Sequence, residues 1–89
     1  MGRLLPLEGL RVLDLSMLMP GPLCTMLLAD WGAEVIKVEP RLGGDPLRAM
    51  GGPGEGDSAF FAGLNRNKKS LAVDLRKEAG RGIVLRLAA

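Results

Sequence analysis

The 89-residue sequence contains no histidine and a single cysteine, Cys24. Without histidine it offers neither the Ser-His or Cys-His pairs of hydrolytic enzymes nor the mixed ligand sets of common zinc sites. A lone cysteine provides no disulfide framework, which is typical of proteins from a reducing cytosol. We therefore expect no metal site, no catalytic histidine and a cytoplasmic location.

Aromatic residues and long apolar runs are also scarce. Trp31, Phe60 and Phe61 are the aromatic side chains, too few for the stacking platforms that bind single-stranded nucleic acid. No uncharged apolar run reaches the roughly 18 residues of a membrane span, and the interrupted N-terminus does not resemble a signal peptide. The sequence predicts neither a nucleic acid nor a membrane as partner. The core should be aliphatic, with methionines as filler and Cys24 as a small buried residue.

The charges are unevenly distributed along the chain. Residues 1–65 carry five basic and eight acidic side chains, whereas residues 66–89 carry seven basic and two acidic ones. Such a local basic segment fits a small phosphorylated ligand better than a general nucleic-acid surface.

The first 40 residues have the pattern of a strand–helix–strand unit. Residues 10–16 form a short apolar run that is typical of a buried parallel strand. A Pro-Gly-Pro turn at residues 20–22 predicts a helix that begins at its second proline and is closed by Gly32. Residues 34–39 are rich in β-branched side chains and predict a second strand that stops at Pro40.

The second half of the chain predicts another strand and helix. Residues 41–57 are rich in glycine and proline and predict a long loop, and residues 58–65 a helical turn. A third strand is expected at residues 70–75, and helical spacing of apolar residues predicts a helix over residues 77–89. Two helices cannot cover both faces of a three-stranded parallel sheet. We therefore expect an incomplete α/β fold, the opening part of a larger protein.

Three local patterns could bind an anion, and each also has a plainer interpretation. The glycine turn before the first helix could present backbone N–H groups to a phosphate, or could simply connect strand and helix; it lacks the nicotinamide fingerprint. Glu39 could bind a ribose or be a solvated strand-end residue. The third pattern is a group of five cations around the third strand: Arg66, Lys68, Lys69, Arg76 and Lys77. These cations could bind phosphate at the edge where open α/β sheets bind ligands, or could belong to a solvated basic loop.

Two longer stretches of the sequence read LPLEGLRVLDLSMLMPGPLCTMLLADWGAEVIKVEPRLGGDPLR and LNRNKKSLAVDLRKEAGR. The first contains GP-x-C at the opening of the first helix, and the second contains N-x-N-K-[KR]-S-L before the third strand. Together they resemble the family III CoA-transferases, and the resemblance runs from about Leu5 to the last residue. The family includes formyl-CoA transferase, carnitine CoA-transferase and α-methylacyl-CoA racemase.

This resemblance implies a fold, a ligand and partners. Family members have a Rossmann-like large domain that binds coenzyme A, in a homodimer whose subunits are threaded through one another. Residues 1–89 would be the N-terminal part of that domain, and the substrates would be acyl-CoA thioesters and carboxylic acids. The catalytic carboxylate of the family lies beyond Ala89, so none is assigned here and the segment alone is expected to be inactive.

The resemblance also implies which positions contact CoA. They lie in the loop before the first helix, at the end of the second strand and at the end of the third, where the adenine and phosphates are held. At the second of these places Pro40 occupies the position of a phosphate-binding arginine, and an arginine follows it. The implied CoA-binding residues are Met19, Pro20, Arg41, Val73, Asp74, Leu75 and Arg76.

Several functions remain open on the sequence alone. The intact protein would either exchange CoA between carboxylic acids or racemise a 2-methylacyl-CoA. A nucleotide-binding oxidoreductase domain would share the strand–helix–strand pattern, and a non-enzymatic interaction module is a further alternative.

Overall fold

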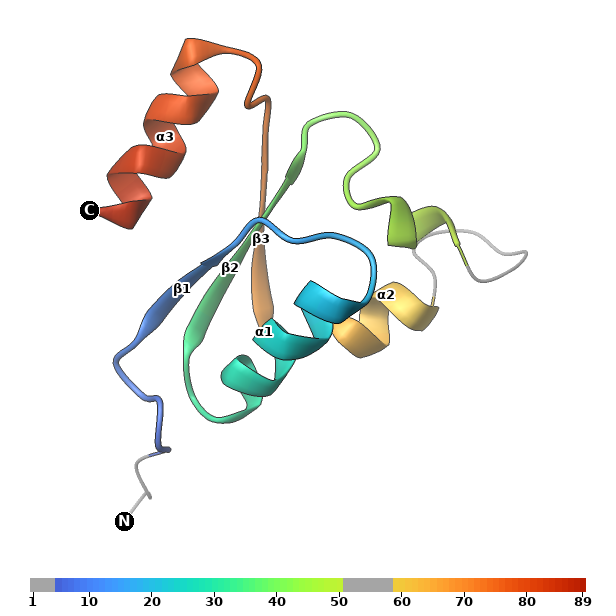
Figure 1. The fold of residues 1–89 in the computed structure, drawn as a ribbon, viewed down its shortest axis with the longest axis vertical. Helices are drawn as coiled ribbons and strands as arrows, with labels where there is room; N and C mark the ends of the chain where they lie inside the picture. Colours follow the sequence, from blue (N-terminus) through green and yellow to red (C-terminus); the bar gives the residue numbers. More distant parts are fainter. Residues whose placement is uncertain (1–4, 51–58) are drawn as a thin grey trace.

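The computed structural model describes residues 5–50 and 59–89, in which strands and helices alternate along the chain (Figure 1). The short helix η1 is a 3-10 helix. The elements are β1 (Arg11–Asp14), α1 (Pro20–Asp30), β2 (Glu34–Pro40), η1 (Pro46–Ala49), α2 (Ala59–Leu64), β3 (Lys68–Val73) and α3 (Glu78–Ala88). The predicted strand–helix–strand unit is confirmed. Part of the predicted loop at 41–57 is the helix η1, and the rest of that loop from residue 51 lies outside the described residues.

The three strands form one parallel sheet in the order β1-β2-β3. Val35 in the central strand stands opposite Val12 on one side and Lys68 on the other. All three strands therefore end at the same edge of the sheet, which is where open α/β sheets bind ligands. This arrangement confirms the predicted Rossmann-like fold class.

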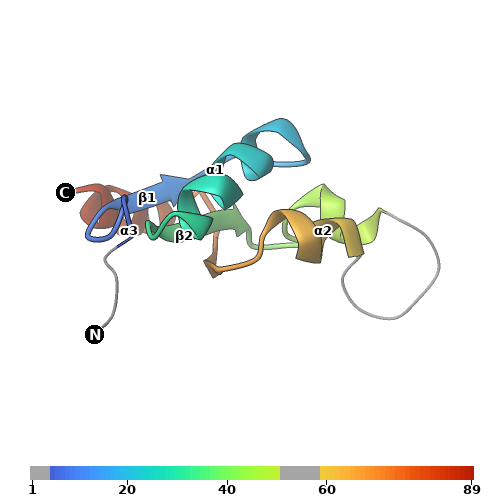
Figure 2. The same ribbon diagram turned by 90° about the horizontal axis from the view of Figure 1, so that it is seen from below.

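Helix α1 lies across β1 and β2 and covers one face of the sheet (Figure 2). It begins at Pro20, two residues before the predicted start, because the fixed φ of proline suits the first turn of a helix. It ends at Asp30, and Gly32 beyond it has a φ of +107°, which confirms the predicted glycine cap. The inward side of α1 buries Ala29 against Val35.

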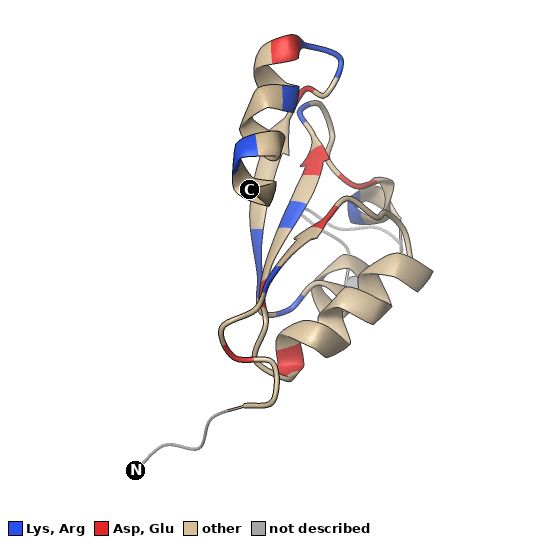
Figure 3. Cartoon of the chain, turned by 60° about the vertical axis from the view of Figure 1, so that its left-hand side comes forward, with Lys and Arg blue, Asp and Glu red and all other residues tan. Residues whose placement is uncertain are grey.

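Helix α3 lies on the opposite side of the strands from α1 (Figures 1 and 3), but Gly80 is its buried residue, so it packs less closely on the sheet than α1 does. Its first turn approaches the end of β3 closely. A Cβ atom on Gly80 would lie 2.1 Å from the carbonyl oxygen of Asp74, so only glycine fits there. Among residues 5–50 and 59–89, no helix combines the length and the hydrophobicity that a bilayer crossing requires.

Two expectations about burial are wrong. Cys24 is exposed, because it lies on the side of α1 that faces away from the sheet. Of the methionines in the described residues, Met26 is buried on the inward side of α1, whereas Met17, Met19 and Met50 are exposed. A helix that covers one face of a sheet buries one of its own sides, and periodicity alone does not say which residues lie there.

Strand β3 begins at Lys68 and ends at Val73, two residues earlier than predicted at each end. It can begin with a lysine because the Lys68 ammonium reaches an interior carboxylate. It ends where it does because the Asp74 carboxylate accepts a hydrogen bond from the backbone N–H of Arg76, which turns the chain toward α3.

Candidate functional site

A pocket of about 440 Å³ lies at the carboxyl edge of the sheet. Each strand contributes one wall: Leu15 and Met17 follow β1, residues 38–42 end β2, and residues 73–76 end β3. The surface combines aliphatic side chains with two arginines. The structure thus brings together one binding residue predicted after β2 and the whole segment predicted after β3.

The other two predicted binding residues, Met19 and Pro20, stand at the N-terminus of α1 and are not among the residues that line the pocket. They continue the loop from Met17, which does line it. Loop and pocket therefore form adjacent parts of one edge of the sheet.

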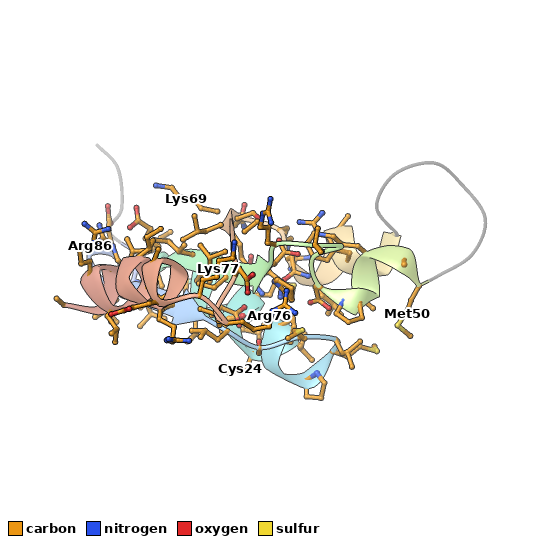
Figure 4. The ribbon with its side chains drawn as sticks, turned by 90° about the horizontal axis from the view of Figure 1, so that it is seen from above. Cys24, Met50, Lys69, Arg76, Lys77 and Arg86 are labelled. Carbon is orange, nitrogen blue, oxygen red and sulfur yellow. The ribbon has the colours of Figure 1, made fainter. Side chains whose placement is uncertain are left out.

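Arg76 stands at the pocket with its side chain 84% exposed to solvent. Its Nε lies 3.1 Å from a carboxylate oxygen of Asp74. This side-chain hydrogen bond lowers the pKa of Asp74 and raises that of Arg76. Figure 4 shows Arg76 close to Lys77 at the beginning of α3. The guanidinium is thus restrained by one carboxylate and still open to a ligand from solvent.

The other members of the predicted basic cluster do not reach this pocket. Three of them make ion pairs with carboxylates of the chain: Arg66 with Asp30 at 2.8 Å, Lys68 with Asp14 at 3.0 Å, and Lys69 with Glu34 at 2.9 Å. The fourth, Lys77, lies next to Arg76 just before α3 (Figure 4). A six-residue strand separates its two ends by roughly 17 Å. The five cations therefore lie at both ends of β3 and do not gather at one site, and Lys69 points to a different side of the molecule from Arg76 (Figure 4).

Asp14 is the centre of a buried polar cluster beneath the start of α1. Its carboxylate accepts hydrogen bonds from the backbone N–H and the hydroxyl of Ser16, from the hydroxyl of Thr25 at 2.6 Å and from the ammonium of Lys68 at 3.0 Å. Burial by itself raises the pKa of Asp14, but these hydrogen bonds together outweigh it and lower the pKa to about 2. The cluster ties β1, α1 and β3 to one another.

Glu39 is neither a ribose-binding residue nor a solvated residue at the end of a strand. Its side chain is 3% exposed, and its two oxygens accept bonds from the guanidinium of Arg48 at 2.7 Å. The hydroxyl of Ser70 and the backbone N–H of Asp45 donate two more, at 2.6 and 2.9 Å. The Arg48 bond is the main reason that the pKa of Glu39 falls to about 2, against the opposing effect of burial. With both oxygens engaged, Glu39 holds the structure and is not available to a ribose.

A second buried ion pair, which the sequence did not predict, lies next to the pocket. Lys37 and Asp45 are 1% and 0% exposed, and the Lys37 Nζ lies 3.0 Å from an oxygen of Asp45. The same carboxylate accepts hydrogen bonds from the backbone N–H groups of Leu18 and Leu47. Burial opposes these contacts, but they lower the pKa of Asp45. Two features of the sequence could have indicated this pair: a lysine in the middle of an apolar strand, and an Asp-Pro pair at the start of a helix.

These lowered pKa values predict a loss of stability in acid. Because folding lowers the pKa of Asp14 from 3.8 and that of Glu39 from 4.5, each to about 2, both carboxylates stabilise the fold above their unfolded values. Each contribution of about 2 to 3 kcal/mol should disappear as the pH falls from about 4.5 to 2. Hydrogen exchange of β1 and β2 measured across this range will test it. A midpoint of destabilisation above pH 5 would contradict the assignment.

Comparison with known proteins agrees with this architecture. The profile of CoA-transferase family III matches residues 7–89. The succinyl-CoA:glutarate CoA-transferase of Mus musculus is 51% identical over 85 residues, which cover 94% of this chain and 20% of that protein. The succinyl-CoA–D-citramalate CoA-transferase of Chloroflexus aurantiacus is 49% identical over 83 residues, 92% of this chain and 21% of that one.

Solved structures give the same result. A CAIB/BAIF family protein from Brucella suis matches with a TM-score of 0.84 and 40% identity, over 96% of this chain and 24% of that one. The hypothetical protein Rv3272 from Mycobacterium tuberculosis matches with a TM-score of 0.84 and 45% identity, over 94% and 23%. The chain thus spans about a fifth of the length of the curated relatives described above. It belongs to CoA-transferase family III.

Proposed function

We propose that this chain forms part of the coenzyme A site of an enzyme that transfers CoA between carboxylic acids through acyl-CoA thioesters. The observation that carries the proposal is the pocket at the carboxyl edge of the sheet. Its walls contain residues 73–76, which match a CoA-binding segment of the family, and Arg41, which directly follows the matching position at Pro40.

The composition of the pocket suits the nucleotide end of CoA. Aliphatic side chains such as Leu15, Val38 and Leu75 offer an apolar surface to the flat adenine ring. Arg41 and Arg76 line the same pocket and can make charge-assisted hydrogen bonds to phosphate oxygens. On this basis the loop at Met19 and Pro20 would contact a more distant part of the CoA molecule.

The buried carboxylates of this segment are poor candidates for the group that attacks the thioester. Asp14, Glu39 and Asp45 are enclosed and their oxygens accept hydrogen bonds from several donors. A nucleophilic carboxylate must reach the substrate carbonyl, which these cannot do without dismantling the fold. We therefore assign this segment to binding, and propose that the nucleophile comes from another part of the full-length protein.

Transfer is favoured over the other candidate activities. The two curated relatives described above are both CoA-transferases that use succinyl-CoA, which favours exchange over racemisation. The turn before α1 also lacks the glycine fingerprint of a nicotinamide-binding domain. Family membership favours an intertwined homodimer, and the single cysteine favours a cytoplasmic location.

An exchange assay tests this function. We expect the full-length protein that contains this segment to convert succinyl-CoA and a second dicarboxylic acid, glutarate first, into succinate and the new CoA thioester, seen by mass spectrometry. Incubation with a pure 2-methylacyl-CoA epimer and titration with NADH serve as controls. Racemisation without acid exchange would favour the racemase. Binding of NADH without binding of CoA would favour an oxidoreductase, and the proposal would be withdrawn.

A further inference from the structure

The loop between β1 and α1 is held in place by buried charged groups. The ammonium of Lys37 donates to the carbonyl oxygen of Ser16 at 3.0 Å, and the carboxylate of Asp45 accepts from the N–H of Leu18 at 3.1 Å. Lys37 and Asp45 are themselves paired at 3.0 Å and are almost completely enclosed. The loop is therefore attached to the central strand and to the start of η1 by one buried ion pair.

The part of this loop just before α1 has little local support for its conformation. Leu18 has a φ of +69°, a left-handed conformation that a leucine rarely adopts unless its surroundings impose it. Met19, the N-cap of α1, makes no side-chain hydrogen bond to the helix. Pro20 favours the start of the helix itself, but the conformation of Leu18 before it must be imposed by tertiary contacts, and the bond from Leu18 to Asp45 is the one that acts at the strained residue.

Asp45 also joins two walls of the pocket. Its backbone N–H donates to Glu39 at the end of β2, and its carboxylate caps η1 through the N–H of Leu47. Glu39 lies in the wall formed by the end of β2. Leu18 directly follows Met17, which lies in the wall after β1. A change at Asp45 would therefore alter the separation of these two walls.

We propose that Lys37 and Asp45 are positioning residues for CoA binding, whose buried ion pair fixes the loop before α1 relative to the end of β2. This inference rests on the proposed function, since it assumes that the pocket receives CoA. Neither side chain contacts solvent in the described structure, so both act through the loop. The ligand affected is the acyl-CoA thioester, whereas the chemical step stays with groups outside this segment.

The variant Asp45→Ala in the full-length protein provides the first test. We expect the KM for the acyl-CoA to rise about tenfold or more while kcat at saturation changes by less than about twofold, because the variant disturbs binding and not the reacting groups. The control is Lys69→Ala, which removes an exposed ion pair on another side of the molecule. An unchanged KM in folded Asp45→Ala protein, with only a lower melting temperature, would overturn the inference.

Two double variants separate positioning from folding. Lys37→Met/Asp45→Asn and Lys37→Met/Asp45→Leu both remove the buried charges, but only the asparagine keeps an oxygen for the N–H of Leu18. We expect the KM of the asparagine variant to stay within about threefold of wild type, and that of the leucine variant to be at least about fivefold higher than it. Equal KM values in the two would overturn the inference even if Asp45→Ala does not fold.

Arg76→Ala in the same assay distinguishes this inference from the proposed function. A higher KM in Arg76→Ala with no change in Asp45→Ala would leave the CoA site in place and remove only the positioning role. If the wild-type protein neither binds nor uses an acyl-CoA, the proposed function fails, and the positioning role fails with it.

Discussion

Replacing Lys68 with methionine is expected to lower the free energy of local unfolding by about 3 to 5 kcal/mol. The side chains of Lys68 and Asp14 are 2% and 1% exposed, so the variant leaves a buried carboxylate without its counter-ion. The Lys68 ammonium also donates to the carbonyl oxygen of Pro22 in the first turn of α1. Burial lowers the pKa of Lys68, and the pair with Asp14 opposes that shift, which keeps the charge inside.

The neighbouring lysine gives a matched control for this effect. Lys69 lies next to Lys68 in β3 but is 70% exposed, and its pair with Glu34 is open to solvent (Figure 3 shows how the charged residues are distributed over the strands). Exposed ion pairs contribute little, so Lys69→Met should leave stability unchanged. Hydrogen exchange of β1 and α1 should become roughly a hundredfold to a few thousandfold faster in Lys68→Met alone. Equal protection in both variants would show that the buried pair does not stabilise this unit.

Replacing Arg76 with alanine is expected to raise the KM for the acyl-CoA substrate of the full-length enzyme about tenfold or more. The variant removes a guanidinium from the pocket and also frees the carboxylate of Asp74, which Arg76 now restrains. An unpaired carboxylate at that place would repel the phosphates of CoA, so both changes weaken binding. Because Arg76 is proposed to bind the phosphates of CoA and no reacting group is assigned to this segment, kcat should change little.

Two further arginine variants separate local charge from total charge. Arg76→Lys keeps a cation at the pocket and should retain most of the affinity for the acyl-CoA. The remaining loss reflects the fork geometry of the guanidinium, which lysine does not have. Arg66→Ala removes the same net charge from the other end of β3, where Arg66 is paired with Asp30, and should leave the KM unchanged. Steady-state kinetics with varied acyl-CoA will measure all three. A KM that does not change in Arg76→Ala would remove Arg76 from the site.

Structural elements that depend on residues close together in the chain could be predicted from the sequence. The apolar run at β1, the β-branched run at β2 and the glycine after α1 predicted these elements to within a few residues. The same local signals placed the end of β3 at the edge where open α/β sheets bind ligands, and the resemblance to the family assigned residues 73–76 to the CoA site. Such signals survive because backbone conformation is largely set by short-range sterics and by the periodicity of burial.

The roles of the charged residues depended on the tertiary structure. A lysine run in sequence looks like one cationic surface, but a strand points successive side chains to opposite faces. Lys68 therefore enters the interior, where it meets a carboxylate 54 residues earlier in the chain, whereas Lys69 faces solvent. Likewise Lys37 finds Asp45 only because the chain after β2 folds back over the strand.

The sequence by itself determined the α/β fold class and the family, and it indicated the general place of the proposed CoA site. Only the tertiary structure decided which charges are available to a ligand and which hold the fold together. The physical reason is that burial makes an unpaired charge very unfavourable. Each buried cation must therefore meet a carboxylate, and that partner is chosen by the three-dimensional course of the chain and not by its neighbours in sequence.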